Sequence, residues 1–198
     1  MVESKNFVKS FRSGLLDAVQ DVGHAFCTRQ GGVSGGLYRS LNCGFGTKDD
    51  PALVEQNRAL ALAQLPSSNA KLITCHQVHS SNVVFVLDPW NKENAPIADG
   101  MVTNRPNLAL GILSADCAPV LLADPSSGII GAVHAGWRGA VGGVIESVLE
   151  LMVKNGAKIS AIIAAIGPCI GLKSYEVDSE FKSLFIENDP LNENYFFR

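Results

Sequence analysis

A long apolar run near the middle of the chain most constrains the fold. The segment "LALGILSADCAPVLLAD", residues 108–124, is apolar almost throughout and is interrupted by Asp116 and Pro119. Such a run is typical of strands that are buried on both faces. It is too short and too interrupted to span a bilayer. We therefore expect a central pair of strands with a break between Asp116 and Pro119.

Several neighbouring segments extend this region into a buried sheet. The turn "DPSSG", residues 124–128, leads into the strand "IIGAVHAG", residues 129–136. The segment "AIIAAIGPCIG", residues 161–171, predicts a further buried strand that ends in a Gly-Pro turn. Upstream, residues 71–76 and 82–87 predict two strands on either side of the polar turn "QVHSS", followed by a polar loop.

Two segments predict helices. In "DDPALVEQNRALALAQL", Asp49 or Asp50 is the expected N-cap, Pro51 lies in the first turn and Pro66 ends the helix. The second helix is expected over residues 140–156 and ends at a glycine C-cap. Its apolar face consists of Val144, Ile145, Val148, Leu149 and Met152.

Composition and charge exclude several classes of protein. Hydrophobic residues make up 46% of the chain and charged residues 18%, which suits a globular core. The net charge is −3 and no basic stripe is present, so we expect no nucleic acid partner. The first 16 residues lack a long apolar segment, and the five cysteines form no C-x-x-C pair. We therefore expect a cytoplasmic protein with reduced thiols and no membrane partner.

Three residues form a candidate metal site. His79 lies in the polar turn "QVHSS", Cys117 follows an aspartate inside the apolar run, and His134 ends an apolar strand. Two imidazoles and one thiolate are a ligand set for zinc that leaves a fourth position open. Two alternatives remain open: a thiol hydrolase in which Cys117 is the nucleophile and His134 its base, or structural histidines in ordinary hydrogen bonds.

Further polar residues are candidates for substrate binding. Arg29 and Arg138 are flanked by small residues, and a guanidinium suits phosphate or carboxylate, although a solvated surface position is the alternative. Thr28 and Asn42 lie with Arg29 in the glycine-rich segment 23–48, a composition that suits a loop folded around a ligand. Asp116 is a candidate for holding a substrate or a water molecule, or for a buried hydrogen bond.

These residues lie in motifs through which the chain resembles the YfiH/laccase-domain family, also called DUF152. The similarity extends over residues 24–177 in the order of the family. The matching stretches are "TRQGGVS", "LNCG", "DDPALVEQNR", "QVHS", "ADG", "ADCAPVLLAD", "HAGWRG", "IGPCIG" and "YEV".

The resemblance implies a fold and a ligand set. The fold is an α+β, four-layer α/β/β/α sandwich of mixed sheets, here as one domain over residues 1–198. The family's zinc ligands correspond to His79, Cys117 and His134. Family members continue beyond the position of Arg198, so the resemblance also implies that a C-terminal part is missing.

The resemblance further implies a zinc-dependent purine nucleoside phosphorylase that takes inosine, adenosine or methylthioadenosine together with phosphate, and that has adenosine deaminase activity. A copper-dependent polyphenol oxidase (laccase) and a Cys–His hydrolase or deamidase acting on cell-wall peptides are the alternatives. Four histidines are too few for the copper centres of a laccase, which favours the nucleoside activity.

The expected roles follow from that activity. Arg29 and Arg138 would hold phosphate, and Asn42 or Asp116 would hydrogen-bond the nucleoside. For deamination, metal-bound water attacks C6 of adenine, and zinc deaminases use a glutamate as proton shuttle. No glutamate lies in the ligand motifs, so Asp116 would have to replace it beside Cys117 and His134.

Overall fold

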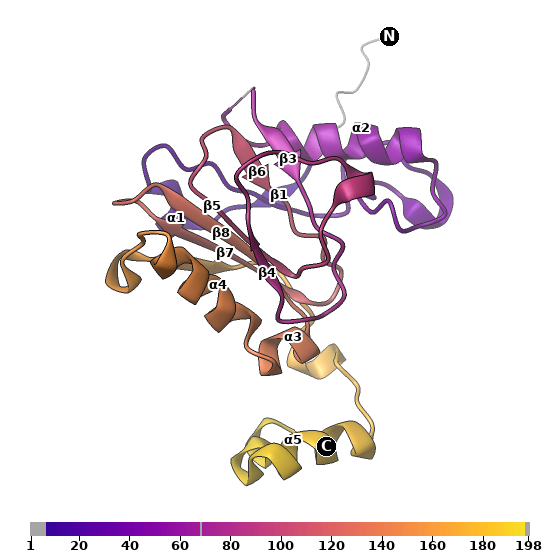
Figure 1. Cartoon of the computed structure of the whole chain (residues 1–198). Helices are drawn as coiled ribbons and strands as arrows, with labels where there is room; N and C mark the ends of the chain where they lie inside the picture. Colours follow the sequence, from indigo (N-terminus) through magenta and orange to yellow (C-terminus); the bar gives the residue numbers. More distant parts are fainter. Residues whose placement is uncertain (1–6, 68, 197–198) are drawn as a thin grey trace.

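The computed structural model describes residues 7–67 and 69–196 and centres on one mixed sheet (Figure 1). The strand order of this sheet is β4-β5-β8-β7-β9. Strand β4 pairs in parallel with β5, and the other neighbours are antiparallel. The bounds are Val83–Phe85 for β4, Gly100–Thr103 for β5, Ala118–Asp124 for β7, Ile129–Ala135 for β8 and Ile163–Ile166 for β9.

Helix α4 (Val144–Lys154) covers one face of this sheet. Its residues Val144, Val148 and Met152 are fully buried against β7 and β8. The single helix expected over residues 140–156 is two helices, because Gly143 adopts a left-handed φ of 82° and separates α4 from α3 (Trp137–Val141). The expected C-cap is confirmed, since Gly156 has a φ of 109°.

The opposite face is covered by short elements from the N-terminal part of the chain. Strands β1 (Ser10–Phe11) and β2 (Phe26–Cys27) pair with each other, and α1 (Gly14–Asp17) follows β1. Leu16 and Phe26 form a cluster with Ala123 and Ala165 of the large sheet. This face also carries His134, and so it is the face of the candidate site.

A second small sheet and an outer helix complete the layers. Strands β3 (Lys71–Ile73) and β6 (Leu108–Leu110) pair in parallel, and α2 (Pro51–Leu62) lies outside them (Figure 1). Asp50 is the N-cap of α2, where its carboxylate accepts a hydrogen bond from Ala52 N. From α4 through the two layers of strands to α2, the order matches the expected α/β/β/α sandwich.

Three strand predictions need correction. The apolar run does not form a strand pair, because β6 and β7 belong to different sheets and residues 111–117 lie between them without regular structure. Strand β9 is an edge strand of the described sheet, and Ile166 is 70% exposed rather than buried. Strand β5 was not expected, since its four residues are too short for a periodic pattern, yet all are buried between β4 and β8.

The remaining helical segments are short. The 3-10 helices are η1 (Gly36–Tyr38), η2 (Lys92–Asn94), η3 (Ile159–Ala161), η4 (Leu172–Ser174) and η5 (Pro190–Tyr195). Helix α5 (Ser179–Asn188) and η5 form a lobe below α3, and Phe181 of this lobe contacts the Trp137 ring at 4.9 Å between centroids (Figure 1). The end of the chain is helical up to Tyr195, and Phe197 and Arg198 lie outside the described residues.

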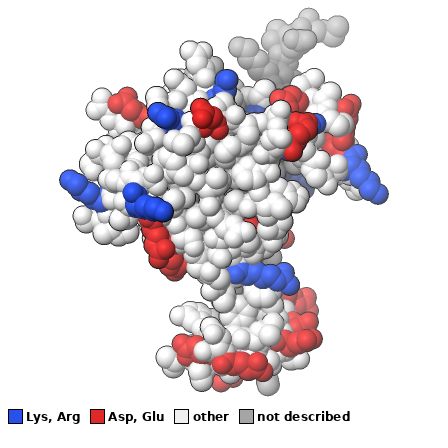
Figure 2. Space-filling view, viewed as in Figure 1, with Lys and Arg blue, Asp and Glu red and all other residues white. Residues whose placement is uncertain are grey.

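Charges are distributed unevenly over the surface. Figure 2 shows acidic residues along the α5 lobe, and acidic and basic residues interspersed over the body. Within the described chain, none of the helices has the length and apolar character needed to cross a bilayer.

Candidate metal centre

The buried carboxylate of Asp99 organises the turn that carries His79. Asp99 is fully buried and accepts hydrogen bonds from the backbone N–H groups of Val78, His79 and Ser80 at 3.2, 2.9 and 2.7 Å. The Ser80 hydroxyl donates a fourth hydrogen bond at 2.8 Å. His79 has a left-handed φ of 62°, which is unfavourable for a residue with a Cβ. The hydrogen bonds to Asp99 therefore hold His79 in a conformation that it would not adopt alone.

The same carboxylate orients His134. Its Oδ1 lies 2.8 Å from His134 Nδ1. Because an ionised carboxylate only accepts hydrogen bonds, Nδ1 carries the proton and Nε2 is free to bind a metal. Burial alone would raise the pKa of Asp99, but the hydrogen bonds from His134, Ser80 and Val78 outweigh it and lower the pKa to about 2.

His79, Cys117 and His134, hereafter the trio, converge on one point. Their ligand atoms all lie within 4.8 Å of one another, and Cys117 Sγ is 3.6 Å from His79 Nε2. In a tetrahedral zinc site, bond lengths of about 2.0–2.3 Å place two donors roughly 3.5 Å apart. His79 is exposed, Cys117 is half-buried and His134 is buried, so a substrate can approach from the His79 side. The donor set and spacing fit a zinc ion with an open fourth position.

Two glycines of the "HAGWRG" motif allow its backbone to pack closely against the trio and the turn that carries His79. A Cβ on Gly136 would lie 2.5 Å from His79 Cδ2 and 3.1 Å from Cys117 Sγ. A Cβ on Gly139 would lie 2.9 Å from the Ser80 carbonyl oxygen. Any larger residue at position 136 would therefore have to displace the ligands.

The surroundings of Cys117 do not activate its thiol as a nucleophile. Burial, and then the charges of Asp116 and Asp99, raise the pKa of its thiol. A catalytic thiol needs a lowered pKa, usually from a nearby cation. The alternative of a Cys–His hydrolase also assigned His134 as the base, but the imidazole nitrogen found 3.6 Å from the thiol is His79 Nε2.

The candidate residues of the glycine-rich loop form hydrogen bonds within that loop. Arg29 donates two hydrogen bonds to the Arg39 carbonyl, at 3.1 and 2.5 Å. Thr28 Oγ1 accepts a hydrogen bond from Gln30 N. The Asn42 side-chain amide donates to Thr47 and Asp49 and accepts from Gly44 N. The hydrogen bonds recorded for these three side chains within the described residues all stay inside the loop and do not reach the trio.

Arg138 and Asp116 lie next to the trio along the chain and are exposed. The Arg138 guanidinium lies 4.4 Å from the centre of the Trp137 ring. The Asp116 carbonyl accepts a hydrogen bond from Ile170 N at 2.9 Å, which ties the segment before Cys117 to the chain after β9. Both charged side chains are thus open to solvent and close to the trio along the chain.

Asp99 was not among the residues expected at the site. Its signal in the sequence is weak, since it is one aspartate in the short stretch "ADG" at the start of a strand that the pattern did not predict. Only the structure shows that it contacts two segments far apart in the sequence.

Comparisons with known proteins identify relatives of this chain. A family model described as multi-copper polyphenol oxidoreductase laccase matches residues 23–198. A protein of Streptomyces coelicolor named purine nucleoside phosphorylase is 41% identical over 89% of this chain and 73% of its own length. A second one, from Streptomyces griseus, is 44% identical over 80% of this chain and 65% of its own length. The chain thus spans about two thirds of the length of the latter relative.

Solved structures show the same fold. YfiH of Bacillus licheniformis superposes with a TM-score of 0.76 at 32% identity, over 88% of this chain and 68% of that one. YlmD of Geobacillus stearothermophilus gives a TM-score of 0.74 at 33% identity, over 82% and 63%. These matches confirm the expected YfiH-like fold class. The chain therefore belongs to the laccase-like YfiH (DUF152) family.

Proposed function

We propose that the chain carries the metal centre of a zinc-dependent purine nucleoside phosphorylase. The observation that supports this most is the trio itself, assembled around one buried carboxylate in a chain 41–44% identical to proteins named purine nucleoside phosphorylase. The substrates would be inosine, adenosine or methylthioadenosine, together with phosphate.

Different residues of this chain would have different roles in phosphorolysis. In this reaction the bond between C1′ and the purine breaks, a phosphate oxygen bonds to C1′, and the base leaves with a proton. The exposed guanidinium of Arg138 would hold the phosphate dianion, because a guanidinium donates two parallel hydrogen bonds to its oxygens. The exposed carboxylate of Asp116 would accept a hydrogen bond from the nucleoside. A zinc ion on the trio would act as a Lewis acid toward a developing negative charge.

The other predicted residues have supporting roles in this proposal. Asp99 holds His79 and His134 in their ligand geometry. Thr28, Arg29 and Asn42 shape the glycine-rich loop and make no direct contact with substrate. Adenosine deamination at the same centre would use Asp116 as the proton shuttle, since it is the exposed carboxylate adjacent to Cys117 in the chain.

Copper-dependent oxidation of phenols is the second candidate, because the matching family model carries that description. The number and positions of the histidines argue against this oxidase activity. Of the two histidines outside the trio, His24 accepts a hydrogen bond from Ser13 N, and His76 lies outside the cluster of candidate ligands. The trio is the one cluster of potential ligands found in residues 7–67 and 69–196, whereas a laccase needs several copper ions.

One set of assays separates the candidates. Wild type, Cys117→Ser and the control Cys27→Ser, which alters an exposed thiol, are compared for bound metal and for three reactions. These are hypoxanthine release from inosine with and without phosphate, inosine formation from adenosine, and phenol oxidation with added copper. We expect phosphate-dependent hypoxanthine release that is lost in Cys117→Ser and kept in Cys27→Ser. Copper-dependent phenol oxidation without any turnover of nucleoside would overturn the proposal.

A further inference from the structure

The side chain of Gln77 pairs with the backbone of Leu113 in both directions. Gln77 Nε2 donates a hydrogen bond to the Leu113 carbonyl oxygen, and the Leu113 N–H donates one to Gln77 Oε1, both at 2.8 Å. Two directly opposed residues of antiparallel strands exchange hydrogen bonds in the same way. The half-buried amide of Gln77 thus replaces a strand partner for Leu113, which lies outside the strands of the described chain.

Both residues are close along the chain to a ligand of the trio. Gln77 is two residues before His79, and Leu113 is four residues before Cys117. At the other end of these two short arms, Cys117 Sγ lies 3.6 Å from His79 Nε2. Because a chain extends by no more than about 3.6 Å per residue, the position of Leu113 limits where the Cys117 thiol can lie.

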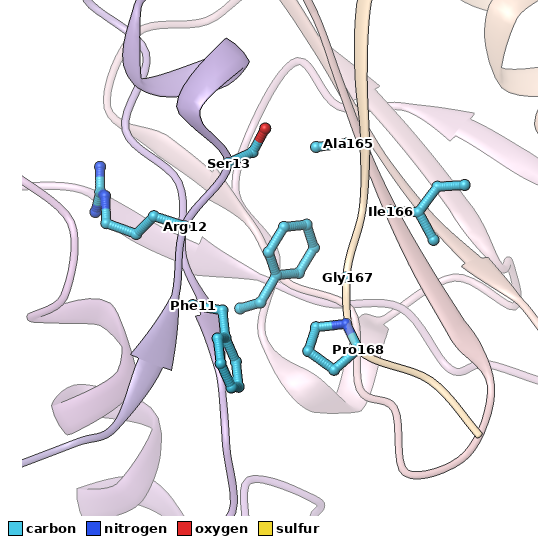
Figure 3. Close-up of a pocket in the computed structure, with 8 residues that line it drawn as sticks. Phe11, Arg12, Ser13, Ala165, Ile166, Gly167 and Pro168 are labelled. Atoms are coloured by element: carbon cyan, nitrogen blue, oxygen red, sulfur yellow. The ribbon is translucent and has the colours of Figure 1, made fainter. Parts of the chain in front are cut away.

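The loop between β6 and β7, which ends at Cys117, has few other anchors. Toward its end, the Asp116 carbonyl oxygen accepts a hydrogen bond from Ile170 N at 2.9 Å, just after Pro168 in the chain that follows β9 (Figure 3). For residues 112–115, the hydrogen bonds recorded from other segments of the described chain come from Gln77. The amide of Gln77 is therefore the main polar contact that fixes the middle of this loop.

The carboxylate of Asp99 does not supply this link. Its hydrogen bonds within the described chain go to the turn around His79 and to the His134 ring. Asp99 thus aligns the two histidines with each other, whereas Gln77 ties the loop of the cysteine to the turn that Asp99 holds. The alignment of the imidazoles and the placement of the thiol depend on different side chains.

We propose that Gln77 is a positioning residue of the metal centre, whose amide holds the loop before Cys117 so that the thiolate meets the two imidazoles as the third ligand. In this role Gln77 contacts neither metal nor substrate and acts through Leu113. The inference rests on the metal centre of the proposed function and does not depend on the reaction that the centre catalyses.

The test compares Gln77→Met, which keeps the length of the side chain and removes both hydrogen bonds, with the matched control Gln64→Met. Gln64 is also half-buried, and its amide donates to the Leu60 carbonyl oxygen at the end of α2. Zinc affinity is measured by competition with a chromophoric chelator. The thiolate-to-metal charge-transfer band of the cobalt-substituted protein reports the sulfur ligand.

We expect zinc affinity to fall about 10–100-fold in Gln77→Met, as is typical when a group that orients a metal ligand is removed. At a cobalt concentration that saturates the wild type, the charge-transfer band of Gln77→Met should be weaker in the same proportion as cobalt binding. Gln64→Met should keep the zinc affinity and the band of the wild type.

The zinc-free protein gives a second readout that involves no metal. Alkylation by iodoacetamide is followed for each cysteine by mass spectrometry. We expect Cys117 to react several-fold faster in Gln77→Met, because the loop before it opens more readily. Cys43, which is half-buried in the glycine-rich loop, should keep its wild-type rate. Circular dichroism checks folding, and Gln77→Glu, which keeps the acceptor for the Leu113 N–H, replaces Gln77→Met if that variant does not fold.

Lower zinc affinity, with faster alkylation of Cys117 and an unchanged rate at Cys43, supports the positioning role. Wild-type zinc affinity in Gln77→Met overturns it, whatever the loss of stability. Equal acceleration at Cys117 and Cys43 also overturns it, since the substitution would then loosen the whole molecule. A wild type that binds zinc but cleaves no nucleoside contradicts the proposed phosphorylase activity alone, because zinc affinity and alkylation still decide the role of Gln77.

Discussion

At the scale of single residues, Asp99 is the link between the two histidines of the trio. It contacts the backbone around His79 and the ring of His134, although these residues are 55 positions apart in the sequence. The three candidate ligands were named from the family motifs, whereas the residue types alone also allowed a thiol hydrolase or structural histidines. The role of Asp99 was not predictable, because an isolated aspartate has many roles and only its tertiary contacts distinguish them.

Asp99→Asn should weaken the metal site without removing a ligand. The amide cannot accept as many hydrogen bonds as the carboxylate, and it has no charge to stabilise the Nδ1 proton of His134. We expect zinc affinity to fall about 10–100-fold, measured by competition with a chromophoric chelator. Asp178→Asn, which alters the exposed N-cap of α5, is the control. Equal zinc affinity in Asp99→Asn and wild type would show that the carboxylate does not support the ligands.

Gly136→Ala should also reduce zinc affinity, for a steric reason. The new Cβ would lie 2.5 Å from His79 Cδ2, so the imidazole or the backbone has to move. Gly35→Ala is the matched control, because nothing lies within 4 Å of its Cβ position. The same chelator competition measures both variants, and a Gly136→Ala protein with the zinc affinity of Gly35→Ala would rule out this packing argument.

At the scale of elements, helices α2 and α4 and the short strands β3 and β4 were predicted, whereas β5 and the sheet assignment of β6 and β7 were not. Helix α2 begins at the expected N-cap, because the signals for its start, Pro51 and the Asp50 carboxylate, involve only neighbouring residues. Helix α4 ends as expected at Gly156. The assignment of β6 and β7 to different sheets depends on long-range pairing, which an apolar run does not encode. Strand β5 was not predicted because its four residues show no alternation of apolar and polar side chains.

Helix α4 should contribute to stability through its buried face. Met152 is fully buried in the cluster that joins α4 to the large sheet. Met152→Ala should lower the free energy of unfolding by about 2–5 kcal/mol, because it removes buried surface and leaves a cavity. Val153→Ala, on the 45% exposed neighbour, should change it by less than about 0.5 kcal/mol. Urea unfolding of both variants measures the difference, and similar losses would contradict the observed orientation of α4.

The turn between β7 and β8 should make stability depend on pH. Burial alone would raise the pKa of Asp124, but hydrogen bonds from Lys158, Ser126 and Ser127 outweigh it and hold the pKa well below its ordinary value. The unfolded chain takes up this proton near pH 4, while the folded chain keeps the charge. The contribution of Asp124 is therefore complete above about pH 5 and is lost as the pH falls toward the lowered pKa.

The variant Asp124→Asn tests whether Asp124 causes this loss of stability at low pH. We expect the variant to be less stable than wild type at pH 7, and its free energy of unfolding to fall less steeply between about pH 5 and pH 3. Urea unfolding at several pH values measures both effects. Parallel curves for wild type and variant across this range would show that Asp124 does not carry the dependence.

At the scale of the whole molecule, the sandwich places residues from three distant segments at one end of the large sheet. The turn after β3, the segment before β7 and the end of β8 contribute one ligand each to the trio. The family motifs predicted the candidate ligands, but their convergence follows only from the tertiary structure.

X-ray absorption at the zinc edge of the purified protein tests the central claim most directly, because it reports the ligand atoms themselves. We expect one sulfur at about 2.3 Å and nitrogen or oxygen ligands at about 2.0–2.1 Å, with the sulfur shell absent in Cys117→Ser and present in Cys27→Ser. A zinc shell without sulfur in the wild type, or one that persists unchanged in Cys117→Ser, would contradict a metal centre formed by His79, Cys117 and His134.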